Sequence, residues 1–149
     1  MIFITHVLAG VLAVSYFTIG NSGISVAVAA LFSALPDIDM VKSKAGRNLQ
    51  PFSTIVSFLF RHRGFLHSFV FTAAVYFGML YLFSQSIAAA AAIGYSSHLL
   101  LDAITKEGIK PFAPFSRVKV RGFIKTGGFL EKVIAASIAV LLLLRLRCA

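Results

Sequence analysis

Cysteine, tryptophan and acidic side chains are scarce in this chain of 149 residues. The single cysteine, Cys148, excludes an internal disulfide framework and a metal site built from cysteine ligands. Charged residues make up only 13% of the chain, while 58% of the residues are apolar and the mean hydropathy is +0.89. A soluble core of this size cannot bury so much apolar sequence, so we expect many side chains to face lipid.

The few acidic residues are outnumbered by basic ones, five to fourteen, which gives a formal net charge of +9. In a soluble protein such a balance would indicate a nucleic-acid partner. Here the basic residues lie in loops between apolar segments, and no recognition-helix pattern accompanies them. We therefore expect membrane lipid as a partner and expect no nucleic acid.

Five apolar segments are candidates for membrane helices, which need about 20 mostly apolar residues each. The first segment contains His6 and lacks the basic start of a signal peptide, so we interpret it as a retained helix. The stretch 52–60 is too short to span. The chain is thus predicted to be a single all-α domain, a polytopic membrane bundle of four or five helices. The predicted spans are residues 2–19, 24–36, 65–83, 87–104 and 129–144.

The basic residues mark one side of this bundle. Loops 37–64 and 105–128 hold eleven of them, whereas the short turns that join the other spans hold none. The positive-inside rule places both loops in the cytoplasm, so the protein is predicted to lie in the inner or plasma membrane. Arg145 and Arg147 would lie on the opposite side, which leaves open whether the fifth segment crosses fully.

All four histidines and three acidic residues fall at the ends of spans on the basic side of the bundle. Ionisable groups within membrane segments are costly and are functional hypotheses by default. Zinc takes about four ligands, so seven candidates exceed one site and predict two or more divalent ions, zinc or alternatively manganese. The predicted metal ligands are His6, Asp37, Asp39, His62, His67, His98 and Asp102.

The spacing of these residues suits metal binding. His98 and Asp102 are four apart, so a helix places them on one face. Asp37 and Asp39 flank one residue, and in an extended segment after Pro36 both side chains would point the same way. Two further residues, Arg61 and Arg63, lie beside the cluster and could neutralise a phosphate.

Each residue also has a simpler interpretation. His6 could be a packing residue that hydrogen-bonds a neighbouring helix, and His98 with Asp102 could be a buried hydrogen-bonded pair. The two aspartates near Pro36 could cap a helix or mark a turn, and the two arginines could be ordinary positive-inside residues. Glu107 is more simply a loop residue than a general base. Glu131 is interpreted as an interfacial partner of Lys132.

Several motifs resemble those of the YdjM-like family of membrane-bound metal-dependent hydrolases. They are THVLAG at 5–10, LPDID at 35–39, HRGFLHS at 62–68, GYSSHLLLDAITKEG at 94–108 and PFAPFS at 111–116. That family is itself similar to zinc-dependent phospholipases C and zinc nucleases, which are helical enzymes with His/Asp metal clusters. By this resemblance the seven predicted ligands would form the metal site.

The sequence therefore predicts a membrane-bound metal-dependent hydrolase that acts on a phosphoester, small or lipid, at the cytoplasmic interface. Asp37 and Asp39 would bridge ions or act as base, and Arg61 and Arg63 would bind the phosphate. Two alternatives from other classes stay open. One is a divalent-metal transporter or sensor, although transport sites usually lie near the bilayer midplane. The other is a non-catalytic scaffold that recruits a partner through its basic loops.

Overall fold

The computed structural model describes residues 1–17, 23–39 and 65–147. In these ranges the chain forms five α-helices and one short 3-10 helix, and no strand longer than an isolated bridge. The all-α prediction is confirmed. The elements are α1 (Phe3–Tyr16), α2 (Gly23–Ala34), η1 (Leu35–Asp39), α5 (Phe69–Leu82), α6 (Gln85–Ala103) and α7 (Phe129–Arg147).

Each predicted span overlaps one of the α-helices, but the boundaries differ. Helix α2 ends at Ala34, two residues before Pro36, whose ring cannot continue a helix. Helix α5 begins at Phe69 because the Ser68 hydroxyl accepts the N–H of Phe71, so residues 65–68 precede the helix. Helix α7 continues beyond 144 to Arg147.

One local prediction was wrong. The LPDID segment was expected to be extended after Pro36, and it is instead the 3-10 helix η1. A proline is well tolerated in the first turn of a helix, since its missing N–H would have no partner there. The direction of the Asp37 side chain is therefore set by the helical turn of η1. It is not set by the two-residue alternation of a strand.

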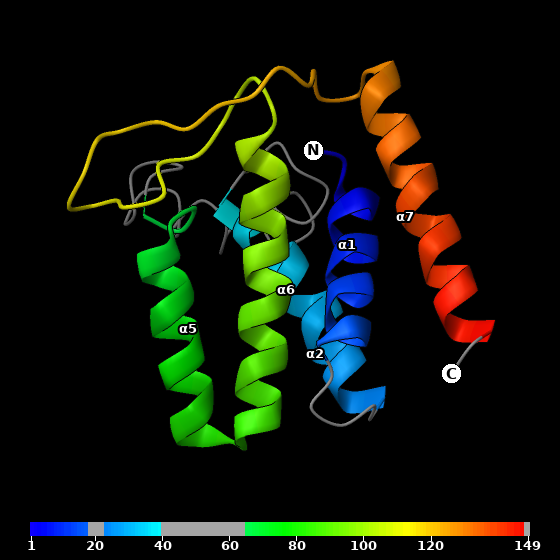
Figure 1. Ribbon diagram of the computed structural model, residues 1–149. Coiled ribbons are helices and arrows are strands. Elements are labelled where there is room, and N and C mark those ends of the chain that lie inside the picture. The colour runs from blue at the N-terminus through cyan, green and yellow to red at the C-terminus, as the bar shows by residue number, and fades with distance from the viewer. Residues whose placement is uncertain (18–22, 40–64, 148–149) are drawn as a thin grey trace.

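The helices lie side by side, with α6 between α5 and α1, and α7 on the far side of α1 (Figure 1). Helix α2 approaches both α6 and α1 closely because small residues face each other. A Cβ on Gly94 would lie 2.3 Å from the carbonyl oxygen of Ala29, and one on Gly10 would lie 2.7 Å from Ser33 Cβ. Such contacts let backbones pack at distances that larger side chains forbid.

Among the described residues, no helix combines the length and the apolar character that a bilayer crossing requires.

Contacts at both ends of helix α7 hold it against α1. At its start, Glu131 is fully buried and accepts the backbone N–H groups of Ile2 and Gly127. At its other end, the Arg145 guanidinium donates to the Ser15 carbonyl oxygen at 3.3 Å and lies over the Tyr16 ring. The predicted interfacial pair of Glu131 with Lys132 is therefore wrong, because the carboxylate serves backbone donors inside the protein.

Candidate metal centre

Five of the seven predicted ligands have described side chains, and they gather at one end of the bundle. This end contains the N-terminus, the end of α6 and the start of α5 (Figure 1). The ligands come from four separate elements or junctions, so only the tertiary fold brings them together. They are His6 on α1, Asp37 in η1, His67 just before α5, and His98 with Asp102 on α6.

His98 is the centre of the cluster. Its side chain is completely buried, and its Nδ1 atom lies 2.7 Å from the Ser33 carbonyl oxygen at the end of α2. A carbonyl oxygen only accepts, so we assign the ring proton to Nδ1, which leaves the lone pair on Nε2. That Nε2 atom lies 3.4 Å from Asp102 Oδ2, as the four-residue spacing predicts.

The other two histidines pack around the His98 ring. The His6 ring stacks on it, with centroids 3.8 Å apart and planes inclined by 18°. The His67 ring meets it edge-on, with centroids 5.4 Å apart. Both histidines also reach the carboxylate of Asp102, His6 Nε2 at 3.3 Å from Oδ1 and His67 Nε2 at 3.8 Å from Oδ2. The carboxylate thus lies within 4 Å of three imidazoles.

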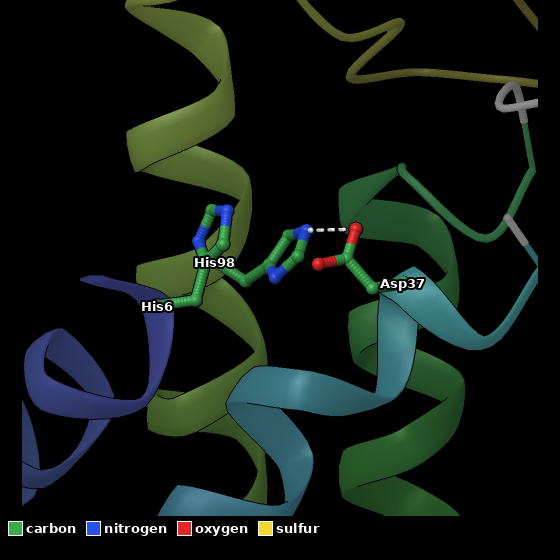
Figure 2. A group of neighbouring side chains, drawn as sticks. All are labelled: His6, Asp37 and His98. Atoms are coloured by element: carbon green, nitrogen blue, oxygen red, sulfur yellow. Dashed lines mark ion pairs between the residues drawn. The ribbon is translucent and has the colours of Figure 1, made fainter. Parts of the chain in front are cut away.

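Asp37 completes the cluster from the side of η1. Figure 2 shows its carboxylate facing His98, with Oδ1 at 3.9 Å from Nε2. The side chain is buried, which is rare for an aspartate unless it is paired or binds a cation. Two groups of three ligand atoms result, in each of which all the atoms lie within 4.8 Å of one another. One is His6, Asp37 and His98, the other is His67, His98 and Asp102, and both contain His98.

The donor atoms fit a divalent metal. Neither ring nitrogen of His6, nor Nε2 of His98, has a hydrogen-bond partner among the described residues, although all three atoms are buried. Buried polar atoms are nearly always satisfied, and an exception calls for an explanation such as an ion. Donor atoms roughly 2.1 Å from a tetrahedral zinc ion lie about 3.4 Å apart. Within the two groups, the contact of His98 with Asp102, at 3.4 Å, matches that spacing. The contacts of His67 with Asp102 and of His98 with Asp37, at 3.8 and 3.9 Å, are somewhat longer.

A cationic group already contacts the Asp102 carboxylate. The Met1 amino group lies 2.7 Å from Oδ1, in a position held by the bond from Ile2 N–H to Glu131. The Asp102 carboxylate is thus in a position where it attracts a positively charged group. This contact could not be predicted from the sequence, because nothing in the residue pattern relates the first residue to position 102.

A second layer of side chains holds the ligands in place. The buried Tyr95 hydroxyl donates to the Leu66 carbonyl oxygen at 2.6 Å and so fixes the backbone directly before His67. Tyr95 was not among the residues predicted from the sequence, although a polar ring inside an apolar helix is a signal that could have identified it. The Ser33 carbonyl is different, because a backbone acceptor has no signature in a sequence.

The side chains of four predicted site residues are not described by the structure. His62, Arg61 and Arg63 lie outside the described residues, and Asp39 is the last residue of η1. Their roles stay predictions.

Glu107, the alternative base, lies on the surface of the segment after α6. The Thr126 hydroxyl donates to its Oε2 at 3.1 Å. Its own backbone N–H and this hydroxyl hold the pKa of the Glu107 carboxyl below its usual value. A carboxylate stabilised in its charged form is a poor proton acceptor near neutral pH, which favours the loop interpretation.

The comparisons with known proteins agree with the motifs. A family profile described as YdjM inner membrane protein matches residues 1–147. The chain is also 35% identical over 139 residues to an uncharacterized protein, YvsG of Bacillus subtilis (strain 168), covering 90% of this chain and 87% of that relative. No solved structure matches.

Proposed function

The chain belongs to the YdjM inner membrane protein family, and from this premise we propose that it is a membrane-bound, metal-dependent hydrolase of phosphoesters. The proposed substrates are phospholipids or smaller phosphoesters at the cytoplasmic face of the membrane. The proposed site holds two or more divalent ions, zinc or manganese. The two His/Asp groups share His98, whose one lone pair would bind one ion, so a second ion would take its ligands from the other predicted residues. When bound, such ions withdraw charge from phosphoryl oxygens and activate water for attack.

One observation carries the proposal. The Nε2 atom of His98 is buried, carries a lone pair by the assignment above, and faces carboxylate oxygens of Asp102 and Asp37 at 3.4 and 3.9 Å. A lone pair opposed to two anionic oxygens in a buried place is unfavourable unless a cation lies among them. A neutral histidine that only packs helices together would instead direct this lone pair at a hydrogen-bond donor.

The roles of the chain's own residues follow from their positions. Ser33 orients His98 through Nδ1, as outer partners of metal-binding histidines commonly do. Asp37 and Asp102 supply the negative charge that offsets a divalent ion. Asp37 also lies where a carboxylate could accept the proton of an attacking water, a role for which Asp39 is the second candidate. Arg61 and Arg63 are proposed to neutralise the phosphate.

The membrane assignment is supported by the outer faces of the helices. Phe77 and Leu82 on α5, and Leu143 on α7, are each more than three-fifths exposed. Exposure of these apolar surfaces to water is unfavourable, whereas lipid acyl chains would cover them. The basic residues between α6 and α7 would then lie in the cytoplasm, at the end of the bundle that contains the cluster.

Metal content per chain tests the first half of the proposal. We expect detergent-purified wild type to contain about two zinc or manganese ions, because the seven predicted ligands exceed the number that one ion takes. Asp102→Asn preserves the side-chain shape and removes the charge, and it should lose at least one ion. The matched control is Ser97→Ala, because the Ser97 hydroxyl bonds to its own helix at Gly94 rather than to the cluster.

Hydrolysis tests the second half. Wild type loaded with metal should cleave a phosphomonoester, a phosphodiester or a phospholipid, and Asp102→Asn should be at least a hundredfold slower. Wild type with bound metal that cleaves none of these would contradict the hydrolase and favour a metal sensor or transporter. Protein that binds no metal after reconstitution would contradict the metal centre itself and favour a scaffold.

A further inference from the structure

The segment between α6 and α7, residues 104–128, has a defined fold of its own. Backbone bridges join Thr105 to Ile124 and Ile109 to Val120, and the Ile109 and Ile124 side chains are buried. Gly108 permits this fold, since it has a φ of +63° and an added Cβ would lie 2.2 Å from the Val120 carbonyl oxygen. The α6–α7 segment is therefore an ordered part of the fold rather than an irregular connection.

Its outer surface combines large apolar groups with positive charge. Phe115 is 85% exposed and Phe123 is 75% exposed, which is unusual for phenylalanines in a folded segment. Exposed basic side chains alternate with exposed valines between them, in the order Arg117, Val118, Lys119, Val120 and Arg121. The one acidic residue of the segment, Glu107, is bonded to Thr126.

The α6–α7 segment also borders the candidate metal centre. It begins two residues after Asp102, and its Pro111 carbonyl oxygen accepts the N–H of Phe69, two residues after His67. Figure 1 shows the segment running across the end of the bundle where the cluster lies. A molecule bound by the segment would therefore be held beside the His/Asp cluster.

We propose that the α6–α7 segment docks onto anionic phospholipid, with Phe115 and Phe123 inserted among the acyl chains. Arg117, Lys119 and Arg121 then bind headgroup phosphates, since basic residues near an anionic membrane surface are attracted to it. This inference rests on the proposed function and deepens it, because it names anionic phospholipid as the class delivered to the cluster. Lipid fits better than nucleic acid, because the segment exposes valines as well as phenylalanines, and the helices likewise expose large apolar side chains.

The chain contains no tryptophan, so Phe115→Trp creates a single fluorescent reporter at an exposed position. This variant would be placed in phosphatidylcholine nanodiscs that contain the same fraction of either brominated phosphatidylglycerol or brominated phosphatidylcholine. We expect the brominated anionic lipid to quench Trp fluorescence at least twice as strongly, because it is enriched around the segment. Adding Arg117→Gln, Lys119→Gln and Arg121→Gln should remove this difference.

Tyr81→Trp provides the matched control. Tyr81 is 90% exposed, lies near the other end of α5 and is far in sequence from the basic stretch, so its quenching should not depend on the lipid charge. Equal quenching of Phe115→Trp by both lipids would overturn the anionic preference. A Phe115→Trp signal that is not quenched by either lipid, or that responds only to an added oligonucleotide, would overturn lipid docking.

The readout does not depend on activity, so the two proposals can fail separately. Metal would be measured in the same preparations. Lipid contact in protein without metal would refute the hydrolase alone, and active metalloprotein whose segment does not contact lipid would refute the docking surface alone.

Discussion

The Nδ1 atom of His98 on α6 lies 2.7 Å from the backbone carbonyl oxygen of Ser33, the penultimate residue of α2. This one bond joins two helices and also selects which ring nitrogen of His98 faces the carboxylates. Folding and ligand chemistry are therefore coupled at this residue, and suitable substitutions can separate them.

His98→Asn keeps a side-chain N–H near the Ser33 carbonyl oxygen and removes the Nε2 ligand atom, whereas His98→Leu removes both. We expect His98→Asn to unfold close to the wild-type temperature and to lose bound metal. His98→Leu should lose metal and also about 1–3 kcal/mol of stability, because the buried carbonyl is left without a donor. Thermal unfolding of metal-free protein and metal analysis measure the two effects. Equal stability of the two variants would show that the Ser33 bond contributes little.

Tyr95→Phe removes the hydroxyl that holds the Leu66 carbonyl oxygen at 2.6 Å. We expect a loss of about 1–3 kcal/mol in unfolding free energy, because a buried acceptor loses its donor. Metal should also bind more weakly, since His67 is the next residue along the chain. Tyr81→Phe, at a 90% exposed position, is the control and should change neither quantity. Unchanged metal affinity in Tyr95→Phe would mean that His67 is positioned by other contacts.

Gly94→Ala adds a Cβ that would lie 2.3 Å from the Ala29 carbonyl oxygen, so α2 and α6 must move apart. Overpacking of this kind costs about 1–3 kcal/mol. The matched control, Gly78→Ala on α5, has open space at the Cβ position and should gain about 0.5–1 kcal/mol from its higher helix propensity. Unfolding midpoints of the two variants should therefore shift in opposite directions, and shifts of the same sign would contradict the close packing described here.

Glu131→Gln replaces a carboxylate that accepts two backbone N–H groups by an amide that offers only one oxygen. One buried donor then lacks an acceptor, which should lower stability by about 1–3 kcal/mol. Limited proteolysis should cut the region between α6 and α7 faster in this variant. The neighbouring Lys132→Ala, at an exposed position, should behave like wild type. Identical cleavage rates for all three proteins would argue against Glu131 as the attachment of α7.

Glu107→Gln tests the base and loop interpretations of this residue, and we expect hydrolysis to stay within about twofold of wild type. The pKa of Glu107 is lowered in the folded protein, so its charged form adds a small stability above its unfolded pKa. That contribution is lost as the pH falls through the lower, folded pKa. The difference in unfolding midpoint between wild type and Glu107→Gln should thus be present at neutral pH and vanish in acid. A large loss of activity would identify Glu107 as a catalytic base.

Much of the fold followed from local pattern. Long apolar runs predicted the helices, and Pro36 predicted the end of α2, because a proline removes a helix donor wherever the chain goes. The four-residue spacing predicted that His98 and Asp102 share a face. The alternation of direction along the bundle also predicted which end would collect the ligands, since short turns force neighbouring helices to run antiparallel.

The sequence by itself determined the helices, the end of the bundle that holds the polar residues and the chemical types of ligand available there. Only the tertiary structure decided that His98 belongs to both ligand groups, that Ser33 orients it, and that Glu131 is buried against the N-terminus. The physical reason is that the periodicity of a helix fixes which side chains share a face of that one helix. The distance between two helices depends instead on packing at Gly94 and Gly10. It depends also on backbone carbonyl acceptors, which cannot be recognised from the residue types in the sequence.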